Sequence, residues 1–293
     1  MDVSIIIVNY NTRDLLKQCI ESIIKHTQNI VFEIIVVDNA SSDGSQQMIK
    51  EVFSEIILIE NQENFGFGRA NNLGSKYAKG NFLFFLNSDT MLIENSIKKM
   101  YDFFSDNDKI LKIGVLGCLL IDENGNPNFS GHQFSTPTLI IKENLFLIIN
   151  TVTSGLLNII FNRIINKIKK SSKSKQIEEI NRTYSEVDFV VGADMLIRRD
   201  LFHSMRGFDE CFFMYFEETD LELNLYRKGY RNFIYNRTKI IHLEGASSGG
   251  GKTMSTKQRI IFHKSKIYYI KKNFRKHFFL VKFIDRIALR LQI

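Results

Sequence analysis

Continuous apolar stretches alternate along the first third of the chain with stretches whose apolar residues recur every three or four positions. The continuous stretches predict strands that are buried on both faces. They lie at residues 3–8, 32–37, 56–60 and 81–86. Residues 14–25 and 69–79 have the spacing of helices that bury one face. Strands that alternate with helices predict an α/β domain with a mostly parallel, doubly wound sheet.

Polar side chains follow three of the predicted strands at the point where each strand ends. Asn9 and Asn11 follow the first strand, and Asp38 follows the second. Asn87 and Asp89 follow the fourth strand. Because ligands of doubly wound sheets bind beyond the carboxyl ends of the strands, we expect these side chains to face a common crevice. This indication of function depends on chain order alone.

The two carboxylates in this group suit different tasks. Asp38 can accept hydrogen bonds from a nucleobase or a ribose hydroxyl, and the alternative is a helix-capping turn formed with residues 41–43. Asp89 can hold a divalent cation against a diphosphate, because such cations prefer hard oxygen ligands. The alternative for residues 87–89 is an ordinary polar turn.

An acidic segment follows a run of mostly aromatic residues late in the chain. Residues 212–216 read FFMYF, and Glu217, Glu218 and Asp220 come after them. If the leucines that follow belong to a helix, these acids lie in its first turn, where the helix dipole favours anions. Neighbouring carboxylates beside apolar rings raise the pKa of one of them, as a general base near neutral pH requires. Charge complementarity at a helix start is the alternative.

Two further segments carry candidate chemistry. His242 ends a short strand at residues 239–241 and could be a metal ligand or a structural histidine. Residues 246–253 (ASSGGGKT) are similar to a phosphate-binding P-loop. A P-loop ATPase also needs a later apolar strand that ends in Asp, and Asp285 is the sole acid in the remainder. We therefore exclude the ATPase and interpret the glycines as a mobile loop over a substrate, with Lys252 able to reach a phosphate.

Charge is unevenly distributed along the 293 residues, whose formal net charge is +7. From Lys252 to the end there are 12 Lys and Arg residues and one acid, while the rest of the chain is mildly acidic. A basic tail is typical of contact with an anionic membrane surface or a nucleic acid. No recognised RNA-binding motif accompanies it, so we expect a membrane surface and no nucleic acid. A solvated helix face is the alternative.

Composition excludes several classes of protein. Hydrophobic residues make up 44% of the chain and charged residues 24%, which rules out a wholly disordered protein. The 3 cysteines lack metal-ligand spacing, so no disulfide scaffold is expected and the compartment is predicted to be reducing. Because the chain enters its first strand almost at once, no signal peptide is expected and the predicted location is the cytoplasm.

The most apolar later window, residues 145–165, is about long enough to cross a bilayer. Asn150, Asn158 and Arg163 make spanning expensive. This window is therefore predicted to lie along a membrane surface or to form a buried helical insert. The chain divides into four predicted segments: residues 1–131, an apolar and basic insert at 132–183, residues 184–251, and a basic amphipathic tail at 252–293.

Six short segments form a recognisable series along the chain. They are SIIIVNYNT at residues 4–12, VVDNASSDGS at 36–45, ENFGFGRANNLG at 63–74, FFLNSDT at 84–90, VGADMLIRRD at 191–200 and GFDECFFMYFEETDLEL at 207–223. In this order the series resembles the family 2 glycosyltransferases of the GT-A fold, in particular their bacterial rhamnosyltransferase-like branch. The resemblance covers most of residues 3–120 and 187–250. It implies a nucleotide-sugar-binding half at 1–131 and an acceptor and catalytic half at 184–251.

The resemblance implies a role for each matching residue. Contacts with the nucleotide-sugar are implied for Asn9, Asn11, Asp38, Asn64, Gly66, Arg69, Asn71 and Asn87. Gly192 and Ala193 would shape the sugar pocket, and Asp194 would contact the sugar hydroxyls. Asp89 and His242 would hold Mg²⁺ or Mn²⁺ against the diphosphate. The family's general base falls on Glu218, beside Glu217 and Asp220.

Some positions depart from the family pattern. Asn87 replaces the first carboxylate of the usual metal motif, so the metal is expected to bind less tightly or to be partly dispensable. Glu218 stands where Asp is usual, and its extra methylene moves the carboxylate by about an ångström. Asn224 stands where many relatives carry Arg, and the insert at 132–183 matches nothing specific.

The resemblance implies a nucleotide-sugar-dependent glycosyltransferase that inverts the anomeric centre. The implied donor is dTDP-rhamnose, with UDP-sugars as the alternative. The apolar insert and the basic tail motivate the hypothesis that the acceptor is a saccharide or lipid-linked saccharide of surface polysaccharide synthesis, at the cytoplasmic face of the inner membrane. Two other classes stay open. A nucleotide-sugar-binding sensor would bind donor without turnover, and a sugar nucleotidyltransferase would need a Gly-rich loop where Asn9-Tyr10-Asn11 stands.

Overall fold

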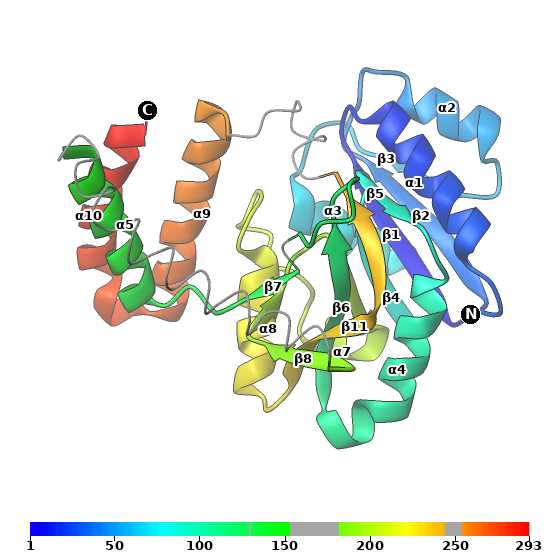
Figure 1. Ribbon diagram of the computed structural model, residues 1–293. Coiled ribbons are helices and arrows are strands. Elements are labelled where there is room, and N and C mark those ends of the chain that lie inside the picture. Colours follow the sequence, from blue (N-terminus) through cyan, green and yellow to red (C-terminus); the bar gives the residue numbers. More distant parts are fainter. Residues whose placement is uncertain (129, 153–181, 244–253, 293) are drawn as a thin grey trace. The chain divides into compact units, whose positions relative to one another are not determined.

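The computed structural model describes residues 1–128, 130–152, 182–243 and 254–292. It separates into two compact units (Figure 1). As far as they are described, the first unit comprises residues 1–133 and 183–252, and the second comprises residues 134–182 and 253–293. The second unit therefore combines residues of the predicted insert with residues of the predicted basic tail.

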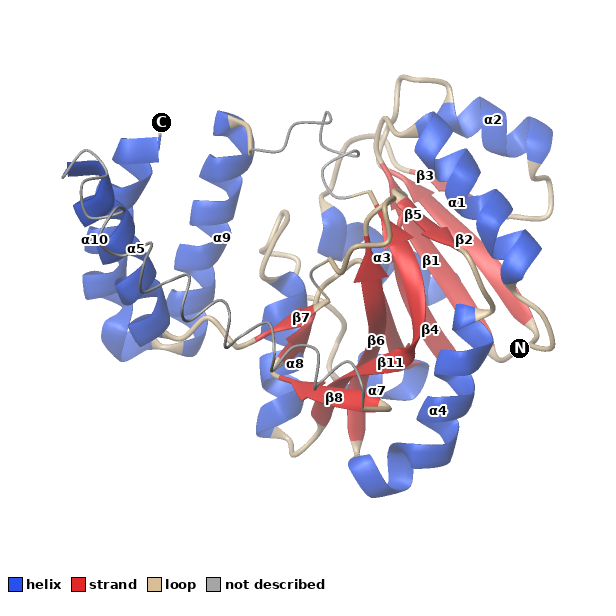
Figure 2. Ribbon diagram, in the orientation of Figure 1, coloured by secondary structure: helices blue, strands red, loops and turns tan. Residues whose placement is uncertain are grey.

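A mixed sheet of nine described strands forms the centre of the first unit (Figure 2). Its strands are β1 (Val3–Asn9), β2 (Phe32–Asp38), β3 (Ile57–Glu60), β4 (Phe82–Asn87), β5 (Thr90–Leu92), β6 (Ile113–Ile121), β8 (Tyr184–Val187), β10 (Asp194–Arg198) and β11 (Arg231–His242). Their order is β3-β2-β1-β4-β10-β6-β11-β5, with β8 paired to β11. A separate pair joins β7 (Gly131–His132) to β9 (Phe189–Val190). The four strands expected at the start of the chain are thereby confirmed.

Helices cover both faces of this sheet. Three share a core cluster with one face: α1 (Arg13–His26), α2 (Ser45–Val52) and α4 (Ser96–Leu111). Three others share a second cluster with the opposite face: α3 (Phe67–Tyr77), α7 (Arg199–Ser204) and α8 (Glu217–Arg227). This arrangement confirms the predicted α/β fold with helices on both faces.

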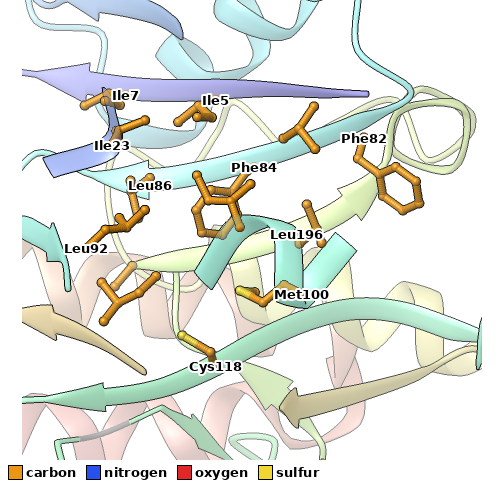
Figure 3. Packing of buried hydrophobic residues seen from close by; sticks show 14 of the residues in the cluster. Ile5, Ile7, Ile23, Phe82, Phe84, Leu86, Leu92, Met100, Cys118 and Leu196 are labelled. Atoms are coloured by element: carbon orange, nitrogen blue, oxygen red, sulfur yellow. The ribbon is translucent and has the colours of Figure 1, made fainter. Parts of the chain in front are cut away.

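The core explains why the strands are continuously apolar. Ile5 and Ile7 of β1 lie with Phe84 of β4 in the first cluster (Figure 3), whereas Ile6 belongs to the second cluster. Successive side chains of a strand point to opposite faces, so a strand covered by helices on both sides is apolar at most positions. This packing fixes the strands and, with them, the polar residues beyond the strand ends.

One edge of the sheet collects strand ends from both halves of the chain. The parallel strands β1, β2 and β4 end there. β10 runs antiparallel to β4, so its first residue, Asp194, pairs with Leu86 at the same edge. β11 also ends there, and its last residue, His242, pairs with Thr90 of β5. The antiparallel strand therefore adds Asp194 to the polar edge that chain order predicts.

The second unit is helical in its described part. Its elements are α5 (Pro137–Val152), α9 (Thr256–Asn273), the 3₁₀ turn η2 (Arg275–His277) and α10 (Phe278–Gln292). Helix α10 packs against both α5 and α9. In the part of the chain that the structure describes, no helix is long and apolar enough to cross a membrane. The predicted apolar window at 145–165 lies partly in α5 and partly outside the described residues.

Candidate active site

A line of hydrogen bonds joins the ends of β1, β2 and β4. The Asn9 side-chain amide donates to a carboxylate oxygen of Asp38 over 2.7 Å. The Thr12 hydroxyl donates to the side-chain carbonyl of Asn9 over 2.6 Å and lies 3.0 Å from the Ser88 hydroxyl. Because Ser88 precedes Asp89, this line links the predicted nucleotide residues to the predicted metal residue. The sequence analysis did not predict Thr12 and Ser88 as site residues. Their position shortly after strand ends is the signal that could have indicated them.

The carboxylate of Asp38 is bound within the protein. Besides Asn9, the backbone amide of Ser41 (2.8 Å) and the side-chain amide of Gln46 (2.7 Å) donate to it. These bonds order the turn between β2 and α2. The N-cap of α2 is Gly44, which makes no side-chain cap bond. Asp38 is also shielded from solvent, so its contact with a nucleobase stays a prediction.

Asn11 ties the turn after β1 to the turn after β2. Its backbone is left-handed, with φ 55°. The side-chain carbonyl of Asn11 accepts from the backbone amide of Ser42 (2.7 Å). The backbone amide of Asn11 donates to the Ser41 hydroxyl (2.9 Å). The residue remains exposed at the sheet edge, where a nucleotide can contact it.

The loop after β3 contacts the segment that leads into α8. The Asn39 side chain donates to the Gly66 carbonyl (3.1 Å), and Asn64 accepts from the Gly66 amide (2.9 Å). Gly66 has φ +83°, and a Cβ at this position would overlap the carbonyl oxygen of Phe213. The Phe67 amide donates to that carbonyl over 2.9 Å. Glycine is required because two backbones approach closely here.

Arg69 and Asn71 occupy different environments in α3. The Arg69 guanidinium lies 4.0 Å above the Phe65 ring and 3.8 Å from the Glu210 carboxylate. It remains half-exposed, so it can meet a phosphate. Asn71 is buried and donates to the Phe67 carbonyl over 3.2 Å, so it stabilises the first turn of α3. Contact between Asn71 and a nucleotide-sugar stays a prediction.

Asp89 and His242 lie together as the predicted metal pair. Their Oδ1 and Nε2 atoms are 3.4 Å apart. Metal–ligand bonds of about 2.1 Å place neighbouring ligands about 3 Å apart, so this separation fits one cation. The backbone amide of Leu243 donates to the Asp89 carbonyl (2.9 Å) and keeps the two residues adjacent. Over the described residues, no group of three or more His, Cys, Asp or Glu side chains gathers into a metal site.

Residues 192 and 193 approach both the metal motif and the acidic segment. The carbonyl of Ala193 accepts from the backbone amide of Asn87 over 3.0 Å. A Cβ on Gly192 would lie 3.8 Å from Cγ of Glu218. The small side chains predicted for the sugar pocket therefore lie between Asn87 and Glu218.

Asp194 is a fully buried carboxyl group at the start of β10. One of its oxygens accepts from the backbone amide of Cys118 over 2.7 Å. The other, Oδ1, has no hydrogen-bond partner in the described chain. Burial raises the pKa of Asp194 to about 7, although the Cys118 bonds and the His242 charge oppose this shift. Because solvent does not reach it, contact with a sugar hydroxyl stays a prediction.

Glu217 and Glu218 lie at the start of α8, directly after a strained backbone. Tyr215 and Phe216 both have φ of 71°, a left-handed conformation that costs about 1 kcal/mol or more per residue and clusters at functional sites. Burial raises the pKa of Glu218 to about 7, while backbone amides at the helix start oppose the shift. Burial and the Glu218 charge raise the pKa of Glu217 well above its ordinary value. Glu218 is therefore the carboxylate suited to proton transfer near neutral pH.

Glu222 is a buried acid that the sequence analysis did not single out. It lies one turn after Glu218, and its Oε2 accepts from the Val190 amide over 2.9 Å. Burial raises its pKa, and the charges of Glu218 and Asp194 raise it further. The only sequence signal is its spacing of four residues from Glu218 on a helix. Glu222 therefore adds a third buried acid to the surroundings of Glu218 and Asp194.

Two other predicted residues remain apart from this cluster. Asp220 is buried, and the Asn224 side chain donates to its carbonyl (2.8 Å) and to its carboxylate (3.3 Å). These bonds hold Asp220 within α8. Lys252 lies outside the described residues.

The geometry defines what this edge of the sheet can do chemically. Glu218 offers a carboxylate that titrates near neutral pH. The Asp89 oxygen and the His242 nitrogen lie 3.4 Å apart, close enough to bind the same cation. Such an arrangement can deprotonate a hydroxyl and stabilise a departing anion. Among the described residues, the structure thus brings predicted groups from both halves of the chain to one edge.

Comparison with protein families gives one match over most of the chain. The profile of the family described as "Glycosyl transferase family 2" matches residues 4–206. A poly(ribitol-phosphate) beta-glucosyltransferase of Bacillus spizizenii is 31% identical over 121 residues, which are 40% of this chain and 19% of that protein. An N-acetylglucosaminyl-diphospho-decaprenol L-rhamnosyltransferase of Mycobacterium tuberculosis is 24% identical over 256 residues, which are 84% of this chain and 77% of that protein. For several curated relatives, the match covers less than half of the relative's own length.

Solved structures share the fold. The mannosyltransferase PcManGT from Pyrobaculum calidifontis, in complex with GDP-Man and Mn²⁺, superposes with a TM-score of 0.59. The superposition covers 99% of this chain and 70% of that chain, at 15% sequence identity. At this identity the likeness concerns the fold alone, and it confirms the GT-A architecture expected from the sequence.

Proposed function

The chain belongs to glycosyl transferase family 2, and we propose that it is an inverting glycosyltransferase that moves a sugar from a nucleoside-diphosphate sugar to an acceptor hydroxyl. The observation that carries this proposal is the placement of Glu218 and of the Asp89–His242 pair at one edge of the sheet. With a pKa of about 7, Glu218 is partly ionised near neutral pH and can accept a proton there.

In the proposed reaction Glu218 takes the proton of the acceptor hydroxyl. The oxygen of that hydroxyl attacks the anomeric carbon from the side opposite the diphosphate. The bond between the anomeric carbon and the diphosphate oxygen breaks, and the nucleoside diphosphate leaves with the electron pair. Asp89 and His242 would hold a divalent cation, which would supply Lewis-acid stabilisation of that charge. No covalent enzyme intermediate is needed.

The donor that we propose first is dTDP-rhamnose. The Mycobacterium tuberculosis relative, which is named an L-rhamnosyltransferase, matches 84% of this chain. The order of motifs along the chain also resembles the rhamnosyltransferase-like branch of the family. UDP-sugars are the second candidate, because no hydrogen bond among the described residues indicates which base the predicted nucleotide site prefers.

The acceptor that we propose is a saccharide or lipid-linked saccharide of surface polysaccharide synthesis. The name of the Mycobacterium tuberculosis relative includes N-acetylglucosaminyl-diphospho-decaprenol, a lipid-linked saccharide. A lipid-linked acceptor resides at a membrane, so we propose that the protein associates peripherally with the cytoplasmic face of the inner membrane. The strongly basic stretch from Lys252 onward supports this association.

A thermal-shift screen tests the donor and the cation together. The protein is heated with dTDP-rhamnose, UDP-glucose or GDP-mannose, each with and without Mn²⁺. A ligand at 100 times its Kd adds about 2.7 kcal/mol to the free energy of unfolding, so the donor raises Tm by several degrees. We expect the rise to be larger with Mn²⁺. Asp89→Ala removes the manganese-dependent part, whereas the control Asp106→Ala, at an exposed position of α4, retains it.

Two outcomes of the screen would contradict the proposal. If no nucleotide-sugar raises Tm, the proposed donor class is wrong. If Asp89→Ala binds the donor in Mn²⁺ as tightly as the wild type, Asp89 has no metal role. Donor binding without turnover on any saccharide acceptor would favour the alternative of a nucleotide-sugar sensor.

A further inference from the structure

Helix α10 of the second unit exposes large apolar side chains along one face. Phe279 is 82% exposed and Phe283 is 65% exposed. Ile287 follows them at the same spacing of four residues, which places all three on one side of a helix. We call this side the outer face of α10; it also includes Leu280 and Leu291, which are exposed as well.

The opposite face of α10 already supplies the core of its unit. Val281 and Ala288 are fully buried where α10 packs with α5 and α9. A helix that buries one face in the core normally presents polar residues on the other. Phe279 contacts the ring of its neighbour Phe278 but remains 82% exposed, and an exposed apolar surface of this kind marks an interaction site.

Cations accompany the outer face. Arg286 and Arg290 are exposed and lie directly before Ile287 and Leu291 in the sequence. Residues 254–292 contain 11 Lys and Arg residues and a single acid, Asp285. The surface of α9 and α10 therefore offers cations beside apolar side chains.

The single acid of this region is neutralised inside the unit. Asp285 is buried, and Lys266 (2.6 Å), the His263 ring (2.8 Å) and the Asn144 amide (3.2 Å) all contact its carboxylate. Burial by itself raises the pKa of Asp285, but the contacts with His263 and Lys266 lower it more. The pKa of Asp285 is therefore lowered overall. Asp285 thus stays ionised and paired in the interior, and it does not offset the positive charge of the exposed side chains.

Helix α5, which packs against α10, also exposes apolar side chains. Leu145 and Phe146 are 42% and 47% exposed. Lys142 and Glu143 are both exposed, so α5 adds apolar side chains but no net charge to the unit.

We propose that the outer face of α10 docks on the surface of an anionic lipid bilayer. Apolar side chains inserted at the boundary of headgroups and acyl chains, with arginines at the anionic headgroups, are the pattern of a helix that lies in the interface plane. This inference gives a location to the membrane association proposed above, but it does not depend on sugar transfer.

Other occupants fit the outer face less well. A second copy of this chain would bring two strongly positive surfaces together, and like charges repel. A nucleic acid would be bound by the cations, but it gives no reason for Phe279, Phe283 and Ile287 to project between them. A bilayer satisfies both the apolar and the charged side chains.

Vesicle flotation tests the proposal with the full chain. Vesicles of phosphatidylcholine alone are compared with vesicles of equal parts phosphatidylcholine and phosphatidylglycerol. We expect the wild type to float with the anionic vesicles and to bind neutral ones weakly. Each buried phenylalanine contributes about a tenfold factor in partitioning, so Phe279→Ser/Phe283→Ser lowers binding at least tenfold. Arg286→Glu/Arg290→Glu lowers binding to the anionic vesicles by a similar factor.

Matched controls come from α4 in the first unit. Ile110 is 81% exposed, and the adjacent Lys109 is exposed too. Ile110→Ser and Lys109→Glu leave flotation unchanged if the outer face of α10 is the docking surface. All variants are compared at equal Tm and helix content, so that loss of folding is recognised. A wild type that stays in solution, or controls that lose binding as much as the α10 variants, would overturn the proposal.

The remaining outcomes separate this proposal from the proposed function. A concentration-dependent dimer that Phe279→Ser/Phe283→Ser abolishes, without flotation, would assign the face to a second copy. RNA binding without flotation would assign the face to nucleic acid. Either result overturns membrane docking. If the protein floats but no nucleotide-sugar raises its Tm, docking stands and the proposed function fails.

Discussion

At the scale of single residues, Glu217 and Glu218 show how different surroundings give two identical carboxyl groups different pKa values. Glu217 is buried, whereas Glu218 keeps part of its side chain exposed. Burial raises both pKa values, and the Glu218 charge raises that of Glu217 further, whereas the pKa of Glu218 is about 7. Glu218 is therefore the group suited to exchange a proton at neutral pH.

Replacement of Glu218 by Gln tests this division. The amide has the same shape but cannot accept a proton, so Glu218→Gln lowers turnover by about 10²–10⁴. Donor affinity, measured by calorimetry, stays near the wild-type value because the change leaves the nucleotide loops intact. In the wild type, kcat/KM rises with pH through about 7, because only the ionised carboxylate is a base. The remaining kcat/KM of Glu218→Gln does not rise with pH in this range.

Asp220 provides the control for that assignment. Its carboxylate is tied to Asn224 on its own helix, so Asp220→Asn is expected to keep most of the turnover. If Glu218→Gln retained near-full turnover while Asp220→Asn were inactive, the base would be Asp220.

At the scale of elements, two loops from distant parts of the chain hold the site together. The loop before α3 and the loop before α8 meet where the Phe67 amide donates to the Phe213 carbonyl. Gly66 permits this contact because it has no Cβ and adopts φ +83°. The contact fixes the predicted donor loop relative to the strained turn that leads into Glu218.

Replacement of Gly66 by Ala should break this contact. Gly66 has φ +83° and ψ −174°, a backbone region essentially restricted to glycine that costs Ala about 1–3 kcal/mol, and overlap with a backbone carbonyl adds about 1–3 kcal/mol. Gly66→Ala is therefore expected to lower the free energy of unfolding by about 2–6 kcal/mol, measured by urea denaturation. Turnover should fall as well, because the loop and the base move apart.

Gly125 is the matched control for this change. It has φ +79° but no heavy atom lies within 4 Å of a Cβ placed there. Gly125→Ala carries the backbone cost alone, about 1 kcal/mol, and leaves turnover unchanged. Equal effects of the two substitutions would show that the close approach to Phe213 does not matter.

At the scale of the whole molecule, the first unit stores several acids in its interior. Glu217, Glu222 and Asp194 are buried, and burial raises the pKa of each. A carboxyl group whose pKa is raised by folding binds a proton more tightly in the folded state than in the unfolded one. Its contribution to stability is complete below the unfolded pKa and is lost as pH rises towards the folded pKa.

Glu222→Gln tests this linkage. The free energy of unfolding of the wild type is expected to fall as pH rises above about 4.5, the ordinary value for Glu. Gln stays neutral, and its carbonyl can still accept from the Val190 amide. The wild type should therefore lose stability relative to the variant by roughly 1 kcal/mol per pH unit as pH rises from about 5 towards the raised pKa of Glu222, measured by thermal and urea denaturation. The control Glu51→Gln, at an exposed position of α2, should follow the wild type.

Parallel pH curves for the wild type and Glu222→Gln would contradict the expectation. Such a result would mean that Glu222 is ionised in the folded protein, with a partner for its charge. The acidic cluster around Glu218 would then need to be reconsidered.

The sequence by itself determined the first four strands, the family and much of the polar edge. Buried strands such as Val3–Asn9 are apolar at most positions because helices cover both of their faces, and this leaves a pattern that can be read directly. In parallel strands the carboxyl ends share one edge, so chain order alone predicted that Asn9, Asp38 and Asp89 lie along it.

Only the tertiary structure decided how those residues are used. The antiparallel direction of β10 brings Asp194 to the edge, the Val190 amide engages Glu222, and internal donors occupy the carboxylate of Asp38. The physical reason is that a sequence pattern records which faces of an element are buried. The pKa and the hydrogen bonds of a side chain depend instead on desolvation and on partners brought close from distant parts of the chain.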